Sequence, residues 1–446
     1  MTTSTRLAEL GLSDSGRRTT PPPISTLMQS ALANPNLISL AAGFVDPETL
    51  PTALVGDIVA EFAHDPALGR QALQYGSTGG SPDLRWRMLA EMEREDRVAE
   101  GTYAAAFERT LLTTGSQQLL SLAADALLDP GDIVLVDSPT YFVFLGMMAS
   151  RGVRTIGIET DEGGLNPEAL AEKLAELEAT GELARVKMVS VVSEHSNPTG
   201  VSLLADRRLP LVETVRRFSE RAGRRIVLIE DAAYRGLGFD PEAPEPPSLF
   251  ALDPQGEVVL HARTFSKTFS PGMKVGFGVV PVGLIGPLLA LKGNQDFGSA
   301  HLNQVILSRA MANDRYHEHR RRVVAAYRRK RDVVLEALEE EFGPSGSVGI
   351  SWTVPQGGMY VWLTLPETID TGPQGDLFER ACREGVLYVP GEFCFAAEPT
   401  PPRHHIRLCY GLPPVSALSE GIARLATAIR GRLDQIAVSG DALAAR

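Results

Sequence analysis

Short runs of aliphatic residues alternate along the middle of the chain with longer segments in which apolar residues recur at helical spacing. The runs Ile133–Val136, Val189–Val192 and Ile226–Ile229 predict strands that are buried on both faces. Between two of them, Asn166 followed by Pro167 predicts a helix start, because asparagine caps helices and proline suits their first turn. This alternation predicts an α/β fold, a mostly parallel sheet covered by helices, whose ligands bind outside the carboxyl ends of the strands.

The C-terminal part of the chain has a different pattern. Residues 315–342 predict a long charged helix with apolar residues on one face, and two later strand patterns, Gly358–Leu365 and His405–Cys409, predict a second, smaller sheet. Residues 1–35 predict an irregular arm, since three consecutive prolines at 21–23 are expected to prevent a helix there. The expected organisation is an N-terminal arm at 1–45, a large domain at 46–314 and a small α+β domain at 315–446.

Composition narrows the class of protein. Of the 446 residues, 43% are hydrophobic and 22% are charged, which allows a large core and excludes disordered, collagen-like and coiled-coil proteins. A formal net charge of -12 argues against a nucleic-acid partner. Three cysteines form neither a disulfide framework nor a C-x-x-C metal motif, so no metal is expected. With no apolar run long enough to span a bilayer and no apolar signal core, we expect a cytoplasmic protein without membrane contact.

The first candidate for chemistry is Lys267. It stands just past the strand-like run Val258–Ala262, among small and hydroxyl-bearing residues. A lysine in this position is well placed to form an imine with a carbonyl compound, and the hydroxyls of Thr264 and Ser266 can bond a phosphate. The alternative is a solvated lysine in a polar loop.

Two further motifs follow predicted strands. Asp231 comes directly after Ile226–Ile229, where a buried carboxylate needs a cationic partner such as a protonated ring nitrogen. Tyr234 lies three residues on and can reach the same ligand, and Asn197, in the turn after Val189–Val192, can donate its amide to a ligand oxygen. The alternatives are an N-capping aspartate, a packed tyrosine and a purely structural turn.

Three more signals complete the set. Gly115-Ser116-Gln117 opens an apolar helix, whose unpaired N–H groups can bind an anion. Tyr141 can stack on an aromatic ring. Arg407, inside an apolar strand pattern, favours a carboxylate bound through two nitrogens. A capping turn, a core tyrosine and a buried Asp or Glu partner are the respective alternatives. Together the signals describe one cofactor, pyridoxal phosphate, and an α-amino acid.

In the order and spacing of these motifs the chain resembles the class I/II aminotransferases, which belong to the fold type I pyridoxal phosphate-dependent enzymes. The similarity runs from about residue 38 onward, and the segment from Ser266-Lys267 to Gly276 is its most specific part. Ala41–Glu48, Leu73–Gly76 and Pro355–Met359 are similar to the subgroup of aminoadipate and kynurenine transaminases. The implied fold is a large, mostly parallel sheet domain and a smaller C-terminal α+β domain.

The resemblance also implies roles for individual residues. The cofactor phosphate would be held by Gly115, Ser116, Gln117, Thr264, Ser266 and Lys274. Tyr141 would stack on the ring, Asn197 and Tyr234 would bond its phenolic oxygen, and Asp231 would keep the ring nitrogen protonated. Lys267 would form the internal aldimine and then shuttle the α-proton.

Around the substrate, Arg407 and Asn197 would bind the carboxylate, with Gly43 close by. Tyr75 resembles a tyrosine that reaches the phosphate across a subunit interface, which implies a homodimer with shared active sites. Three residues besides these, Glu194, His195 and His301, are unusual for the family and would either line the substrate side or pack behind it. Lys274 stands where the family usually has arginine, so that contact would not be bidentate.

Three functions follow from this reading. The first is an aminotransferase that moves the α-amino group of an amino acid to a 2-oxo acid in amino-acid metabolism or biosynthesis. The second uses the same cofactor-stabilised carbanion for decarboxylation, elimination or replacement, or carbon–carbon bond formation, because pocket geometry decides which bond breaks. The third, a regulator that fuses this fold to a DNA-binding module, is disfavoured by the short N-terminal segment, the acidic charge and the intact Lys267.

Overall fold

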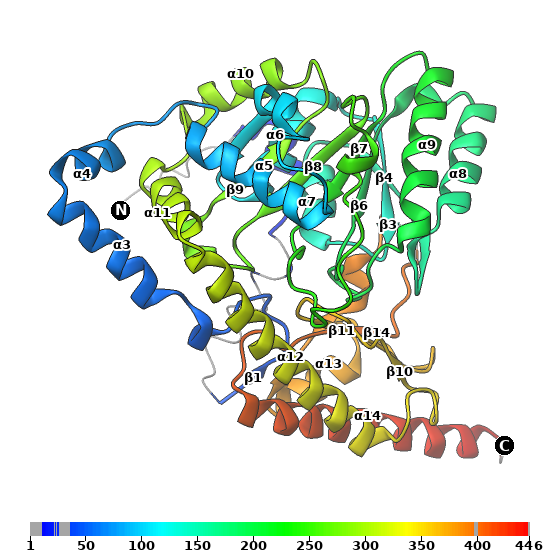
Figure 1. The fold of residues 1–446 in the computed structure, drawn as a ribbon. Coiled ribbons are helices and arrows are strands. Elements are labelled where there is room, and N and C mark those ends of the chain that lie inside the picture. Colours follow the sequence, from blue (N-terminus) through cyan, green and yellow to red (C-terminus); the bar gives the residue numbers. More distant parts are fainter. Residues whose placement is uncertain (1–10, 22, 24, 26–35, 397–399, 445–446) are drawn as a thin grey trace, which may run out of the picture.

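The computed structural model describes residues 11–21, 23, 25, 36–396 and 400–444, with side chains described up to residue 436. A large mixed sheet forms the upper part of the molecule as drawn in Figure 1, and a smaller sheet lies below it between two long helices. The α/β architecture expected from the strand–helix alternation is therefore confirmed.

The large sheet has eight strands, and most neighbouring pairs in its centre are parallel. In spatial order these strands are β2 (Thr110–Thr113), β9 (Gly276–Val279), β8 (Val259–Thr264), β7 (Val227–Asp231), β6 (Val186–Val192), β3 (Ile133–Ser138), β4 (Arg154–Asp161) and β5 (Gly164–Leu165). Only β9 and β5 run against their neighbours. The carboxyl ends of β3, β6, β7 and β8 consequently meet at one edge of the sheet, where a ligand site is expected.

Helices cover both faces of this sheet, which explains why the central strands are rich in apolar residues. On one face, a core cluster joins alternate strand residues such as Leu135 to α5 (Pro82–Asp96), α8 (Pro167–Ala179), α9 (Ala205–Arg221) and α11 (His301–Ala312). On the other, the intervening residues such as Val134 pack against α6 (Ser116–Leu127), α7 (Phe142–Ser150) and α10 (Ile285–Asp296). As predicted, Asn166 caps α8 and Pro167 is its first residue.

The smaller sheet is antiparallel and has a core of its own, which helix α12 links to the core of the larger sheet. Its strands are β10 (Ser351–Trp352), β11 (Tyr360–Thr364), β14 (His405–Cys409) and β13 (Val389–Pro390), and a separate parallel pair joins β1 (Ile38–Ser39) to β12 (Val386–Leu387). The helices around it are α12 (Arg315–Phe342), α13 (Asp376–Arg383) and α14 (Val415–Ala444). Tyr316 of α12 belongs to the core under the large sheet, whereas Val323 and Leu338 belong to the core of the small one. The domain division at 46–314 and 315–446 stays a prediction.

Two helices project from the body at the left of Figure 1: α3 (Thr52–His64) and α4 (Pro66–Leu73). Short 3₁₀ helices lie at Pro47–Thr49, Ala104–Arg109, Leu183–Arg185, Phe250–Leu252, Pro271–Met273 and Gly391–Cys394. No helix in the described part of the chain is long and apolar enough to cross a membrane.

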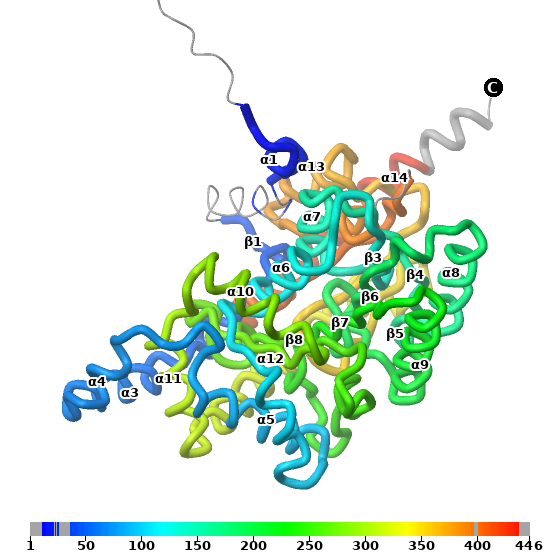
Figure 2. The backbone as a smooth tube through the Cα atoms, turned by 90° about the horizontal axis from the view of Figure 1, so that it is seen from above, coloured from blue at the N-terminus to red at the C-terminus, as the bar shows by residue number. Residues whose placement is uncertain are grey.

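The expectation of an irregular arm at 1–35 is wrong for part of the described residues, whereas residues 11–13 and 19–21 are irregular as expected. Residues Asp14–Arg18 form a short helix, α1, whose first turn is capped by the side chain of Ser13. It lies beside α7, as Figure 2 shows from above. The side chain of Arg18 donates a hydrogen bond to the carbonyl oxygen of Ser150. Pro23 and Ser25 are helical as well, since proline is tolerated in a first helical turn. Residues 1–10 and 26–35 of the predicted arm lie outside the described residues.

Candidate functional site

A cavity of ≈ 370 Å³ opens at the carboxyl ends of the central strands. Its lining comprises Gly43, Phe44, Thr114, Gly115, Ser116, Gln117, Tyr141, Val192, Asn197, Asp231, Ala233, Tyr234, Thr264, Ser266, Lys267, Pro271 and Lys274. The structure thus brings together all of the residues that the sequence proposed for a site, except Tyr75 and Arg407. The topology explains the convergence: Asp231 ends β7, Thr264 ends β8, and Asn197 follows β6.

Lys267 lies in the turn after β8 with its amine inside the molecule. Its Nζ donates a hydrogen bond of 2.7 Å to the carbonyl oxygen of Gly43. Burial lowers the pKa of this amine to about 8, and the positive charges of Arg407 and Lys274 act in the same direction. A substantial fraction of the amine is therefore neutral near neutral pH, and a neutral amine is the nucleophilic form.

Asp231 faces the same cavity as a nearly bare carboxyl group. It is 6% exposed, and its Oδ1 has no hydrogen-bond partner among the described residues. Burial raises the pKa of this carboxyl to about 7, and the nearby Asp137 adds to the effect. Because a buried charge is costly unless it is paired, the group is suited to a ligand that brings a cationic N–H to this position.

A compact group of buried hydrogen-bonding side chains adjoins the cavity. Tyr234 Oη is 3.1 Å from Tyr360 Oη, and the amide Nδ2 of Asn197 donates long bonds of 3.4 Å to both phenols. Tyr234 and Asn197 line the cavity, whereas Tyr360 comes from β11 of the small sheet. The sequence did not single out Tyr360, because an aromatic residue in an apolar strand is normally a core residue.

An anion cradle forms the third wall. Gly115 has a φ of 73° and caps α6, so that the following N–H groups of Ser116 and Gln117 begin a twelve-residue helix. The hydroxyls of Thr264 and Ser266 lie 2.9 Å apart beside it. Lys274, at the end of the 3₁₀ helix Pro271–Met273, supplies a positive charge to the same cavity. Hydroxyls, free amides and an ammonium group together match the needs of a phosphate.

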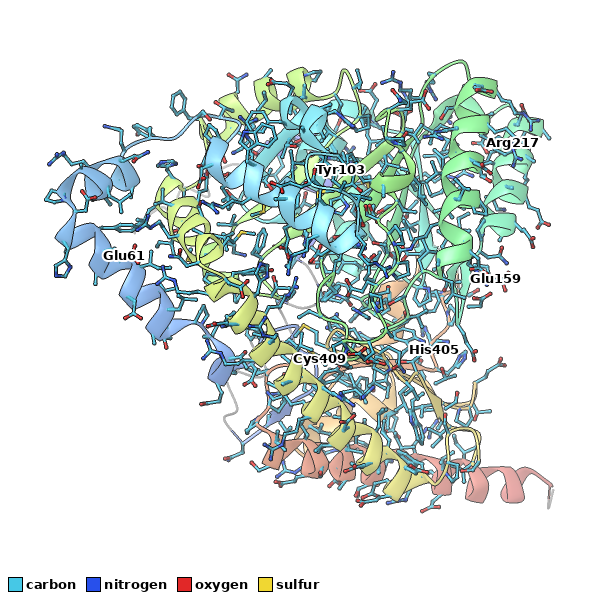
Figure 3. All side chains as sticks on the ribbon, in the orientation of Figure 1. Glu61, Tyr103, Glu159, Arg217, His405 and Cys409 are labelled. Carbon is cyan, nitrogen blue, oxygen red and sulfur yellow. The ribbon has the colours of Figure 1, made fainter. Side chains whose placement is uncertain are left out.

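Arg407 lies behind the cavity rather than in its lining. It occupies the middle of β14, between His405 and Cys409, the two strand ends labelled in Figure 3. It is 2% exposed, and its Nη1 donates to Asn197 Oδ1 at 2.8 Å and its Nη2 to the carbonyl oxygen of Ala41 at 2.7 Å. The alternative of a buried Asp or Glu partner is wrong, because Arg407 forms no ion pair with the described residues. Its Nε is buried without an acceptor there, which leaves this guanidinium able to take a carboxylate.

Four other residues named from the sequence lie away from the cavity. Tyr75 is 82% exposed at the end of the projecting helix α4, with its ring 5.6 Å from that of Phe297. Glu194 is fully buried between Arg208 and Arg235, which outweigh burial and lower the pKa of its carboxyl to about 2.

The remaining two are histidines. His195 Nε2 lies 3.1 Å from a carboxylate oxygen of Glu245, and His301 packs against Gly76. Of the two readings left open for Glu194, His195 and His301, the structure favours packing over lining, because none of them is among the residues around the cavity. The described part of the chain also contains no cluster of metal-ligating side chains.

Comparisons of the sequence and of the structure with known proteins indicate the same family. The family model for aminotransferase class I and II matches residues 35–425. The chain is 35% identical to aromatic-amino-acid aminotransferase 1 of Thermococcus litoralis, over 89% of this chain and 88% of that protein. It is also similar to the solved kynurenine aminotransferase of Pyrococcus horikoshii, with a TM-score of 0.83 and 32% identity, covering 95% of this chain and 98% of that one.

A second solved relative was crystallised with a cofactor derivative. The α-aminoadipate aminotransferase LysN of Thermus thermophilus, complexed with N-(5'-phosphopyridoxyl)-L-leucine, matches with a TM-score of 0.78 and 29% identity. The match covers 95% of this chain and 98% of that one. The sequence matches and the structural matches thus indicate the same family, and the residues that line the cavity are consistent with it.

Proposed function

The chain belongs to the aminotransferase class I and II family, and from that premise we propose that Lys267 and Asp231 operate one active site for α-amino acids and 2-oxo acids. Amino-group transfer dependent on pyridoxal phosphate is the activity of this family, so the protein is an enzyme, and the decarboxylation, elimination and carbon–carbon bond-forming alternatives are not favoured. The observation that carries the assignment to these residues is the presence, in a single cavity, of a buried amine with its pKa lowered to about 8 and a buried carboxyl with one unpartnered oxygen.

The residues present fit pyridoxal phosphate. The unpartnered Oδ1 of Asp231 can accept a hydrogen bond from the N–H of a protonated pyridine nitrogen, and the cradle of Gly115, Ser116, Thr264 and Lys274 can take a phosphate. Gln117 and Ser266 would complete that cradle. Once bound, the cofactor supplies an electron sink that stabilises negative charge at the substrate α-carbon.

The protein side chains supply binding and proton transfer. Lys267 Nζ would bond the cofactor and, once released by the substrate, take the α-proton and deliver it again, which its lowered pKa permits near neutral pH. Tyr141, which lines the cavity, would stack on the ring, and Tyr234 and Asn197 would donate to its phenolic oxygen. Asp231 would hold the ring nitrogen protonated.

Substrate recognition would centre on Arg407 and Asn197. These two side chains are already hydrogen-bonded to each other, and the free Nε of Arg407 offers a further donor for an α-carboxylate. Gly43 would lie beside the substrate, because its carbonyl oxygen contacts the reactive amine. These contacts select an amino acid or a 2-oxo acid by its carboxylate, independently of its side chain.

We further propose that two copies of the chain assemble. Leu73, Tyr75 and Phe297 are 77%, 82% and 60% exposed and lie on or against the projecting helices, and a large apolar surface of this kind is normally covered by a partner. A partner's Tyr75 would then reach the phosphate cradle. Light scattering of the purified protein is expected to give twice the chain mass of 48.0 kDa. A mass of one chain at micromolar concentration would contradict this assembly.

The free thiols of Cys382, Cys394 and Cys409 support a reducing, cytoplasmic location as part of the same proposal. The proposal also keeps the domain division, in which residues 46–314 form most of the cavity and residues 315–446 include Arg407.

The half-reaction tests the proposed activity directly. When the protein loaded with pyridoxal phosphate is mixed with single amino acids and no oxo acid, the visible absorbance is expected to decay as the cofactor becomes its pyridoxamine form. One 2-oxo acid per active site should appear, because the amino group leaves the substrate. A long-wavelength band that persists, or release of ammonia or carbon dioxide, would contradict amino-group transfer.

A further inference from the structure

Tyr360 lies where the small sheet meets the active site, and the proposed mechanism gives this residue no role. It is the first residue of β11, is 1% exposed, and comes from the small sheet rather than from the strands that build the cavity. Its hydroxyl oxygen lies 3.1 Å from Tyr234 Oη and 3.4 Å from Asn197 Nδ2, and its ring meets that of Tyr234 edge to face at 5.6 Å. Burial raises the pKa of the Tyr360 phenol to about 12, so the hydroxyl stays protonated and neutral.

The same side chain also touches the substrate half of the site. The guanidinium carbon of Arg407 lies 4.8 Å from the centre of the Tyr360 ring, a cation–π contact. A Cβ added at Gly43 would lie only 2.8 Å from Tyr360 Oη, so the hydroxyl fills the space beside the residue whose carbonyl oxygen holds Lys267. Tyr360 therefore contacts or adjoins the proposed cofactor-binding pair, the carboxylate-binding arginine and the segment next to the catalytic lysine.

The amide of Asn197 shows what the Tyr360 hydroxyl can do. Asn197 Oδ1 accepts from Arg407, so its Nδ2 has to face the two phenols. Both of its bonds there are 3.4 Å long, and losing one of them would leave the buried Nδ2 with a single weak bond. The Tyr360 oxygen thus supports, from the Nδ2 side, the orientation in which Arg407 holds Oδ1.

We propose that Tyr360 is a positioning residue of the active site, whose hydroxyl orients Asn197 and Tyr234 and so couples the cofactor side of the site to the carboxylate side. This inference rests on the proposed function and deepens it. It predicts two linked effects of Tyr360→Phe, one on the bound cofactor without substrate and one on substrate binding, because the removed hydroxyl serves both.

The first measurement is a pH titration of the absorbance of bound pyridoxal phosphate without substrate. In Tyr360→Phe the midpoint is expected to rise by roughly half a unit to one unit. The reason is that Asn197 and Tyr234, the proposed donors to the phenolic oxygen of the cofactor, lose the hydrogen bond that the Tyr360 hydroxyl makes with them. The second is steady-state kinetics, in which KM for the amino acid is expected to rise roughly three- to ten-fold with a smaller change in kcat.

Tyr410→Phe is the matched control. Tyr410 is 0% exposed, lies in the same core, and its hydroxyl has no hydrogen-bond partner in the described structure. Removing that hydroxyl is expected to leave both the titration midpoint and KM at wild-type values. If Tyr360→Phe behaves like Tyr410→Phe in both measurements while wild type binds the cofactor normally, the inference alone is overturned. If wild type takes up no pyridoxal phosphate, the proposed function fails and the inference fails with it.

Discussion

Replacing Lys267 by alanine is expected to lower amino-group transfer by about 10⁴-fold or more, because the chain then loses both the nucleophile and the proton carrier of the proposed site. Lys274 also lines the cavity, but it belongs to the proposed phosphate cradle and follows the 3₁₀ helix Pro271–Met273, so it is not expected to replace Lys267. The visible absorbance of the reconstituted protein should disappear with the activity, while the circular dichroism spectrum stays that of wild type.

The control for this variant is Lys173→Ala, which removes a surface lysine paired with Glu176 on α8. It is expected to keep full activity and full absorbance. The wild-type protein offers a second check, because cofactor uptake needs the neutral amine: its rate should rise with pH and level off above about 8, where the pKa of Lys267 lies. Normal turnover by Lys267→Ala would show that another residue carries the chemistry.

The second large effect is expected at Asp231. Asp231→Asn keeps the size of the side chain but removes the charge that would hold the cofactor nitrogen protonated, and kcat should fall by about a hundred- to a thousand-fold. Asp231→Glu keeps the charge with a longer reach and is expected to retain more activity than Asp231→Asn. Comparable rates for Asp231→Asn and wild type would rule out this role for the carboxyl.

Stability gives an independent readout for the same variant. The folded pKa of Asp231 is raised above its unfolded value by burial, so folding is penalised once the unfolded carboxyl ionises, and the penalty is complete above about 7. The cofactor-free Asp231→Asn protein is therefore expected to melt above cofactor-free wild type at pH 8. This difference should shrink as the pH falls below 7 and vanish below the unfolded value of 3.8, where the carboxyl is protonated in both states. A variant that loses activity yet gains stability indicates a group kept for function.

Patterns of neighbouring residues in the sequence were sufficient to predict much of the fold and of the candidate site. Asp231, Asn197 and Thr264 each follow a short apolar run, and the ends of parallel strands meet at one edge, so the sequence alone could place them together. The cap at Asn166 and the helix start at Gly115 were readable for the same reason, since a cap depends on a few adjacent residues.

Contacts between distant segments were not readable. Tyr360 reaches Tyr234 across 126 positions of sequence, and its strand pattern gives no sign that the hydroxyl is used. The protein acceptors of Arg407 were not readable either, since they are the amide oxygen of Asn197 and the carbonyl oxygen of Ala41, 366 positions away. Helix α1 was not predicted, because the three prolines at 21–23 argued against a helix in this segment, although Ser13 offers a capping side chain.

The hydrogen bond between Lys267 and the carbonyl oxygen of Gly43 has a consequence for how the enzyme is assembled. An amine that bonds a vitamin-derived aldehyde gives up protons that it would otherwise donate, so loading has to release the chain just after β1 from this tether. Binding of the cofactor is therefore expected to change a contact made by a segment close to the start of the fold.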